Sequence, residues 1–544
     1  MRNRSFLVLV CILVVGFYLR SYHMDYPVVG YHNWKETHYL TEARNFARDG
    51  FFKYGFFIPA KDYPSLRGDS SGAHADTFPV ISVSVALGFM FFGQELWVAR
   101  LISILFNLGF VAGMYFLGRE LFGREDFGLL AAFMSAILPL FVFFSHNVQL
   151  INPGIFFMVL SSVFYVRWRS SFSSREIILC SVFLMFATVT KYSFGVILVP
   201  MVLLFPYKRF WRVGGWRVRR AVGVAFLIFL LVPVWHVYAN YLIPASYRLE
   251  KQAGLSQIQP MDVFHLDWFL IWSFISENYT LFGFYVSLFG LLFMLLFFYR
   301  GRGFGEGFVL AYVLSILPFS VLMSSKLSGH SYHQYPIAPV VVLLISYFII
   351  RVGDYSKELR IEGKRIQHIN VLVVVAIALL FSLLCYEGAS RQFDTQFPGL
   401  DVAGEYIKEH SQPDERILFT VGQTYGILWH ADRKGYPMRV PPPEDFEYAE
   451  ENNLNLRWIF IYEWGFDLLK HEREWSYIKD RFSLKHVAFK QTKDGLHPIY
   501  FLMEKGGSFD ETALNDIVEN FSYNLVEYEY TKGNYEILSA TIGA

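Results

Sequence analysis

Two groups of side chains in this sequence have the chemistry needed to hold an anion. Lys191 lies in an otherwise apolar run, where an unpaired ammonium would cost several kcal/mol. A basic residue in such a recess is a natural partner for a phosphate group. His330, Tyr332 and His333 form a second polar group, close to a proline. Together these residues predict a phosphate-binding site.

Carboxylates and imidazoles elsewhere offer acid–base chemistry. His32 and Glu36 lie in a long polar segment near the N-terminus, and Asp76 lies where an apolar segment begins. A carboxylate or an imidazole can take the proton from an attacking hydroxyl group. Glu36, Asp76 and His32 are therefore candidate acid–base residues. The alternative is that an outer-loop carboxylate such as Glu36 is an ordinary solvated charge.

A third set of side chains is predicted to contact substrate, namely His146, Asn152 and Trp268. For His146, and also for His330, the alternative is an interfacial residue whose amphipathic ring lies at headgroup level.

A divalent metal ion can be held through Glu36, Asp76 and His146. The sequence has no compact ligand motif, so no cofactor is required by it.

Composition defines the class of protein. The chain has 544 residues, of which 54% are hydrophobic and 17% charged, whereas soluble proteins carry about 25% charged residues. This excludes a soluble enzyme and a disordered chain. The net charge of +1 provides no field for a nucleic-acid partner. The three cysteines are too few and too scattered for a disulfide framework or a zinc site.

Apolar stretches long enough to cross a bilayer recur from residue 5 to about residue 387. The sequence therefore predicts a polytopic α-helical membrane protein with about 11–13 transmembrane helices. The predicted spans are 5–22, 78–95, 97–118, 127–145, 153–168, 176–206 as a hairpin, 221–243, 283–299, 307–325, 332–350 and 369–387.

Orientation follows from the short basic loops, which stay on the cytoplasmic side. Segment 207–220 contains six Lys or Arg residues and no acid. The N-terminus is thus expected in the cytoplasm of a multi-pass plasma-membrane protein, with everything after residue 388 outside.

Two domains are expected. Residues 1–387 form the transmembrane domain, and 388–544 form an extracytoplasmic soluble α/β domain. The first extracytoplasmic loop, 23–77, is expected to contain an amphipathic helix over 34–49 that lies on the membrane surface. A second outer loop is expected over 243–277. The soluble domain is expected to contain a helix at 403–410 and strands at 416–421, 458–462 and 499–503.

Several motifs, in their order and spacing, resemble those of the GT-C glycosyltransferases. These polytopic enzymes include the protein O-mannosyltransferases, the lipid A aminoarabinose transferases and the Rgt-type transferases. The resemblance extends from residue 1 to about residue 350. It is carried by Glu36-Thr-His-Tyr39, Glu42-Ala-Arg44-Asn-Phe, Asp49-Gly50, Thr77-Phe-Pro79, Gly118-Arg-Glu-Leu-Phe-Gly123-Arg124, Thr190-Lys191 and His333-Gln-Tyr-Pro336-Ile-Ala-Pro339.

The resemblance implies transfer of a sugar from a dolichyl- or undecaprenyl-phosphate donor. The acceptor would be a lipid, a glycan or a protein at the extracytoplasmic face, and the other partner is membrane lipid. The chain departs from the family at Lys35, where the family usually has a catalytic aspartate. Glu36, Asp76 and His32 remain as bases. Two alternatives stay open, a transporter or flippase and a non-catalytic assembly subunit of a cell-envelope glycan pathway.

Overall fold

The chain forms two compact units in the computed structural model. The first consists of Met1–Met24, Ala75–Ile81 and Trp97–Ser390, and the second of Asp25–His74, Ser82–Leu96 and Arg391–Ala544. The structure describes residues 3–247, 267–301, 303–358, 360–361, 364–365, 368–510, 512, 514 and 523–542.

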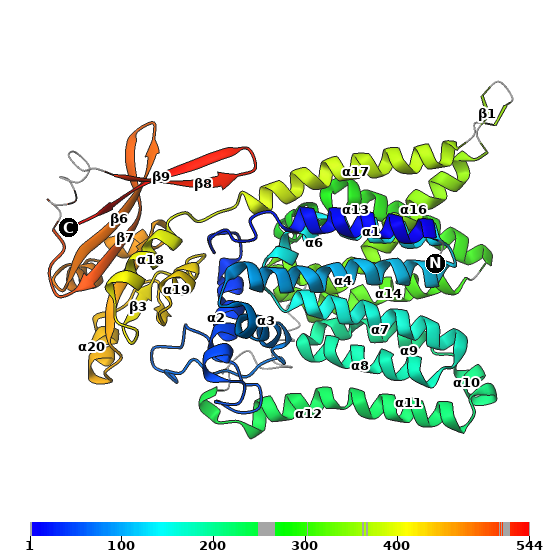
Figure 1. The fold of residues 1–544 in the computed structure, drawn as a ribbon, viewed down its shortest axis with the longest axis horizontal. Helices are drawn as coiled ribbons and strands as arrows, with labels where there is room; N and C mark the ends of the chain where they lie inside the picture. The colour runs from blue at the N-terminus through cyan, green and yellow to red at the C-terminus, as the bar shows by residue number, and fades with distance from the viewer. Residues whose placement is uncertain are drawn as a thin grey trace. The chain divides into compact units, whose positions relative to one another are not determined.

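The first unit is a bundle of apolar helices (Figure 1). Its longer helices are α1 (Asn3–Arg20), α4 (Leu96–Phe122), α7 (Ile151–Ser171), α8 (Ser174–Thr190), α11 (Trp216–Phe229), α13 (Trp268–Gly301), α14 (Phe304–Leu322), α16 (Ala338–Ser356) and α17 (Ile369–Phe393). Shorter elements connect or extend these helices, namely α5 (Glu125–Ile137), α6 (Pro139–His146), η1 (Tyr192–Ile197), α9 (Leu198–Leu203), α10 (Tyr207–Val213), α12 (Leu231–Val237), η2 (Tyr238–Leu242), η3 (Ala245–Tyr247), α15 (Ser324–Leu327) and η6 (Ser331–Ile337).

The predicted polytopic membrane protein is confirmed. Within the described residues, seven helices are long and apolar enough to cross a bilayer, and the pair α5 and α6, bent by 57°, would make an eighth. The predicted number of 11–13 is larger because some predicted spans correspond to short helices. For example, α8 has 17 residues, and α3 (Val80–Phe92) has 13.

The segment that begins at Trp268, expected in an outer loop, is helical and forms the first part of α13. Thr280, with φ 62°, marks a kink between the two parts of this helix. The part that is long and apolar enough to cross a bilayer is Leu281–Gly301, close to the predicted span 283–299. Most of the predicted second outer loop, 248–266, lies outside the described residues.

The second unit contains the predicted α/β fold. Its seven-stranded sheet has the order β4-β3-β5-β7-β6-β9-β8. β4, β3 and β5 are parallel to one another, and the other neighbouring pairs are antiparallel. The strands are β3 (Arg416–Phe419), β4 (Gly435–Pro437), β5 (Leu456–Tyr462), β6 (Phe482–Thr492), β7 (Gly495–Lys505), β8 (Asn524–Tyr530) and β9 (Gly533–Thr541). The three predicted strands correspond to β3, β5 and β7.

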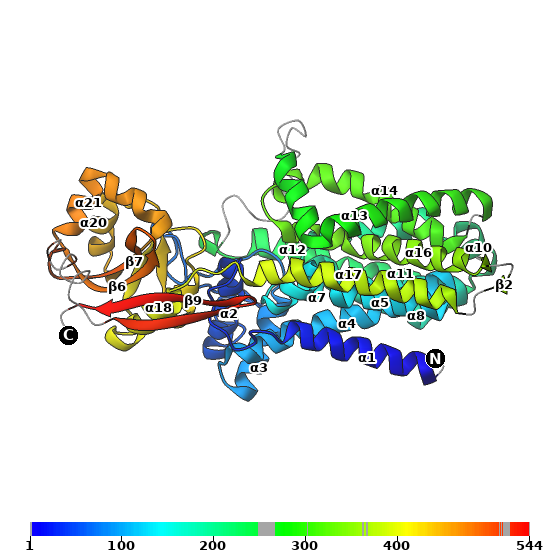
Figure 2. The same cartoon turned by 90° about the horizontal axis from the view of Figure 1, so that it is seen from above.

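Helices cover both faces of this sheet (Figure 2). Side chains alternate along a strand, so Ile417 and Phe419 pack with α18 (Leu400–His410) and α19 (Gly426–Ala431). Leu418 points the other way, into a core shared with α20 (Pro443–Glu451) and α21 (Glu472–Lys479). The predicted helix at 403–410 is the main part of α18.

The first loop is an integral part of this second unit. Helix α2 (Asn33–Asp49) forms as predicted and packs against α19. Its polar residues Thr37 and Glu42 are as buried as Leu40. The expected amphipathic helix on the membrane surface was therefore wrong, because protein covers the polar side of α2 as well as its apolar side.

Arg44 on α2 connects the loop to the C-terminal domain. Its guanidinium lies 2.6 Å from Asp62 and 3.1 Å from Asp432, with 3% of the side chain exposed. It also donates to the carbonyl oxygens of Leu428 and Trp429. A buried cation needs such partners, since desolvation costs several kcal/mol.

We expect Arg44→Met to lower the free energy of unfolding of the second unit by about 3–5 kcal/mol, because Asp62 would keep a buried charge without its cation. Arg48→Met is the matched control. Arg48 also pairs with Asp432 but is 43% exposed, so the expected loss is below about 1 kcal/mol. Thermal unfolding of the full chain in detergent, followed by circular dichroism, measures both. Equal losses for the two variants would contradict this account.

Candidate functional site

The structure brings the predicted phosphate-binding residues of the first unit together. The Nζ of Lys191 lies 3.3 Å from Nδ1 of His333 and 5.1 Å from the ring centroid of Tyr332. His330 stacks on Tyr332 with the ring centroids 5.4 Å apart. These four residues are called the lysine cluster below. About 140 residues of sequence separate Lys191 from the other three residues, but the four side chains form one polar patch.

Breaks in two helices position the lysine cluster. Lys191 directly follows the end of α8 in an extended conformation. His333 lies in η6, which precedes α16. The ammonium of Lys191 can only donate, so Nδ1 of His333 accepts and its Nε2 carries the ring proton. The cluster thus presents a cation and an N–H donor.

Asp76 belongs to the same unit as the lysine cluster. The backbone N–H of Phe78 donates to the carbonyl oxygen of Val189 at 2.9 Å, which fixes this segment beside the end of α8. The indole of Trp235 donates to the backbone carbonyl of Asp76 at 3.2 Å. Asp76 itself is partly buried.

The other two predicted bases belong to the second unit. His32 immediately precedes α2 in a left-handed conformation, with φ 61°, and is 1% exposed. Glu36 lies in the first turn of α2 and is 3% exposed, so it is not the solvated charge of the alternative interpretation. Lys35, where the glycosyltransferases that the sequence resembles usually have an aspartate, lies over the ring of Trp34 at 4.3 Å.

The predicted substrate-contacting residues differ in their environments. The amide of Asn152 is fully occupied: it donates to Ser103 and to the carbonyl of Phe144, and it accepts from Asn107. His146 is buried at the end of α6, and Trp268 is 58% exposed at the start of α13. The contacts of Asn152 therefore favour a structural role.

A second polar cluster, in the second unit, consists of His38, Glu42 and His74. Nε2 of His38 lies 2.7 Å from Oε1 of Glu42, and Nε2 of His74 lies 3.1 Å from the same oxygen. The three ligand atoms lie within 4.8 Å of one another. Within the described residues, this is the one group of three such side chains that could hold a metal ion. It is called the His–Glu–His cluster.

Neighbouring elements hold this cluster. The hydroxyl of Ser82 on α3 donates to Oε2 of Glu42, and the hydroxyl of Tyr63 hydrogen-bonds Nδ1 of His38. A short antiparallel bridge between Ala60 and Ala73 positions the neighbouring residue His74. Gly72 is required there, because a Cβ would lie 2.0 Å from the carbonyl oxygen of Lys61.

The protonation of this cluster follows from its burial and contacts. Burial lowers the pKa of His38 to about 3, although Glu42 opposes the shift. Burial by itself would raise the pKa of Glu42. Interactions with His38 and His74 outweigh it, and they hold the pKa of Glu42 well below its usual range. Glu42 is therefore a carboxylate beside a neutral His38 ring at pH 7.

Sequence reasoning missed the His–Glu–His cluster. The spacing of His38 and Glu42, four residues apart on a helix, places both on one face and was a usable signal. His74 follows 32 residues later in a loop, and no periodic pattern connects it to α2. The possible metal ligands named from the sequence, Glu36, Asp76 and His146, belong to two different units.

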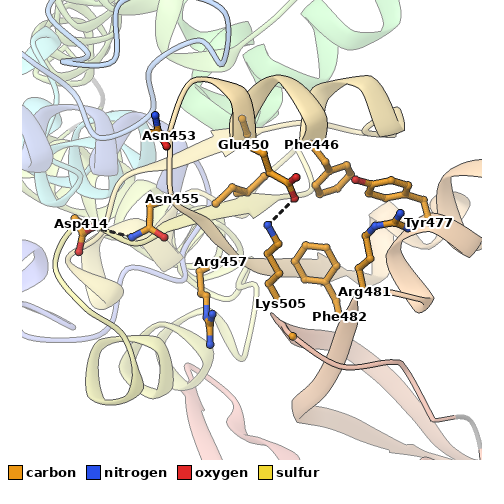
Figure 3. Close-up of a pocket in the computed structure, with 13 residues that line it drawn as sticks. Asp414, Phe446, Glu450, Asn453, Asn455, Arg457, Tyr477, Arg481, Phe482 and Lys505 are labelled. Atoms are coloured by element: carbon orange, nitrogen blue, oxygen red, sulfur yellow. Dashed lines mark hydrogen bonds and ion pairs between the residues drawn. The ribbon is translucent and has the colours of Figure 1, made fainter.

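The C-terminal domain also has a cavity of about 530 Å³ (Figure 3). Some of its charged groups are paired, for example Lys505 with Glu450 at 2.6 Å, and Arg481 lies over the ring of Tyr477 at 3.9 Å. Phe446 and Tyr477 stack at one side, with ring centroids 5.2 Å apart.

Comparison with known proteins finds one matching family model and several similar structures. The model of the family described as dolichyl-phosphate-mannose-protein mannosyltransferase matches residues 74–238, a range that contains Asp76 and Lys191. The archaeal oligosaccharyltransferase AglB from Archaeoglobus fulgidus, in complex with an inhibitory peptide and a dolichol-phosphate, is similar in structure. The TM-score is 0.60 at 12% identity, over 91% of this chain and 74% of AglB.

ArnT from Cupriavidus metallidurans in the apo state gives a TM-score of 0.56 at 12% identity, over 91% of this chain and 97% of ArnT. The chain has the GT-C fold, as the sequence predicted. ArnT bound to undecaprenyl phosphate gives a TM-score of 0.52 at 14% identity, over 92% of this chain and 97% of that chain. No curated protein matches the sequence.

The environment of Asn152 gives a prediction within this GT-C fold. Asn152→Ala would leave Ser103 and Asn107 with unsatisfied buried groups, at a cost of about 1–3 kcal/mol. We expect a lower melting temperature and an unchanged KM for any substrate. Asn534→Ala, at an exposed asparagine, is the control and should melt as the wild type does. A raised KM without a change in melting temperature would instead indicate substrate contact.

Proposed function

We propose that the chain is a membrane glycosyltransferase that moves a sugar from a polyprenyl-phosphate donor to a lipid, glycan or protein acceptor. The lysine cluster is the observation that supports this most strongly. AglB and ArnT, which share the fold, have been solved with dolichol-phosphate and with undecaprenyl phosphate. The same class of donor is therefore the one proposed here.

In this proposal the lysine cluster binds the donor phosphate. During transfer the bond between C1 of the sugar and the phosphate oxygen breaks, and its electron pair stays on the phosphate. The ammonium of Lys191 and the Nε2–H of His333 stabilise that growing negative charge, which is worth most in a site of low dielectric. Tyr332 contributes its ring to hold the ammonium.

The acceptor hydroxyl must lose a proton as its oxygen forms the new bond to C1. Asp76 is the base we favour, because it is the one predicted base in the unit that holds the lysine cluster. Glu36 and His32 are the alternatives. The leaving phosphate needs no strong general acid, unlike the leaving group of a glycoside.

We propose that the reaction takes place at the extracytoplasmic face of the plasma membrane. Helix α8 begins just after the basic residues Arg167 and Arg169 and spans about 25 Å before it reaches Lys191. The basic helix α10 lies at the same end of the bundle as the N-terminus (Figure 1). Since basic loops stay in the cytoplasm, Lys191 faces the other side.

The first test is release of polyprenyl phosphate. Purified full-length protein in detergent is given a panel of dolichyl- and undecaprenyl-phosphate sugars, together with a membrane extract as acceptor. Mass spectrometry should detect free polyprenyl phosphate from at least one donor. No release from any donor would favour a transporter or an assembly subunit.

Lys191→Met removes the cation but keeps the length of the side chain. We expect kcat to fall by about 100-fold, because a charge that stabilises the leaving phosphate is lost. The matched control is Lys208→Met, at an exposed lysine of α10, which should keep wild-type activity. The same melting temperature for both variants excludes misfolding, and full activity of Lys191→Met would refute the assigned role.

The base is identified by comparing Asp76→Asn, Glu36→Gln and His32→Gln. Loss of the base should lower kcat by about 10²–10⁴-fold, and we expect that loss for Asp76→Asn. Asp25→Asn, at an exposed carboxylate, controls for the loss of a negative charge. A larger loss for Glu36→Gln or His32→Gln would move the assignment to that residue.

A further inference from the structure

The hydrogen bonds of His74 pose a problem that a cation would solve. Nδ1 of His74 lies 3.3 Å from the carbonyl oxygen of Gly72. A carbonyl oxygen can only accept, so Nδ1 carries a proton. Nε2 lies 3.1 Å from Oε1 of Glu42, which is an acceptor. This contact needs a positive charge between the two atoms, supplied either by a second ring proton or by a metal ion.

The positions of the donor atoms fit a metal ion. Bonds of about 2.0–2.2 Å around a tetrahedral centre place neighbouring ligand atoms roughly 3.3–3.6 Å apart. The two imidazole nitrogens lie 2.7 and 3.1 Å from the carboxylate oxygen, and the three ligand atoms lie within 4.8 Å of one another. Metal binding would therefore widen the two nitrogen–oxygen separations by about 0.2–0.9 Å.

The outer contacts also match those of a metal site. Metal-binding histidines usually donate their other N–H to a backbone carbonyl or a carboxylate, and ligating carboxylates are themselves hydrogen-bonded. His74 donates to Gly72 in this way, and Ser82 holds the second oxygen of Glu42. The cluster is well shielded, with 2% of Glu42 and 6% of His74 side chains exposed.

We propose that His38, Glu42 and His74 bind one Zn²⁺ ion in the second unit. Two imidazoles and one carboxylate are ligands that Zn²⁺ prefers, whereas Mg²⁺ and Ca²⁺ prefer oxygen alone. Three protein ligands leave the fourth position for water or another oxygen. The ion connects α2 to the loop that carries His74 and so fixes the fold of the first loop. This proposal does not depend on the transferase reaction.

The test measures zinc in the full-length protein, purified with a tag that contains no histidine. The protein is treated with EDTA, incubated with ZnCl₂, desalted and analysed by inductively coupled plasma mass spectrometry. We expect about one Zn²⁺ per wild-type chain. We expect His74→Ala and Glu42→Gln to retain less than about one tenth of that amount.

His497→Ala is the matched control, because His497 is exposed on β7, and it should keep the wild-type amount. A second readout uses the wild type alone, so misfolding of a variant cannot imitate the result. Zn²⁺ should slow hydrogen exchange in residues 59–74 and leave β5 unchanged. The proposal would be overturned if the wild type contained no zinc after desalting, or if His74→Ala contained as much zinc as the wild type. The positive charge in the cluster would then be a proton.

Discussion

Polar groups buried among apolar helices must find their partners inside the protein, and this constraint organises the first unit. Arg20 is fully buried at the end of α1. It donates to the carbonyl oxygens of Gly16, Ser135 and Ala136, and to Asn107. Asn107 in turn donates to Asn152. The network joins α1, α4, α5 and α7.

The same constraint explains the unusual contacts of Lys191. A buried ammonium needs polar or aromatic groups around it. His333 and Tyr332, about 140 residues later in the sequence, supply them. In the second unit, Arg44 meets the requirement through Asp62 and Asp432. The first loop is held to the C-terminal domain by this ion pair rather than by the apolar stripe of α2 alone.

The sequence allowed much of the fold to be predicted, because apolar length and alternation are local signals. Local signals of this kind predicted the apolar runs, α2, the position of Lys191 at a helix break and three strands of the sheet. The edge strand β8 and its neighbour β9 were missed, since their exposed faces are polar. Pairings across long separations, such as Lys191 with His333 or Arg44 with Asp432, depend on tertiary packing and leave no periodic signal. The His–Glu–His cluster was missed for the same reason.

The measurement that tests the central claim most directly is a structure of the full-length protein with a bound polyprenyl phosphate. The account predicts that phosphate oxygens lie within hydrogen-bond distance of Nζ of Lys191 and of Nε2 of His333. A phosphate bound elsewhere, with the lysine cluster unchanged and without ligand, would contradict it.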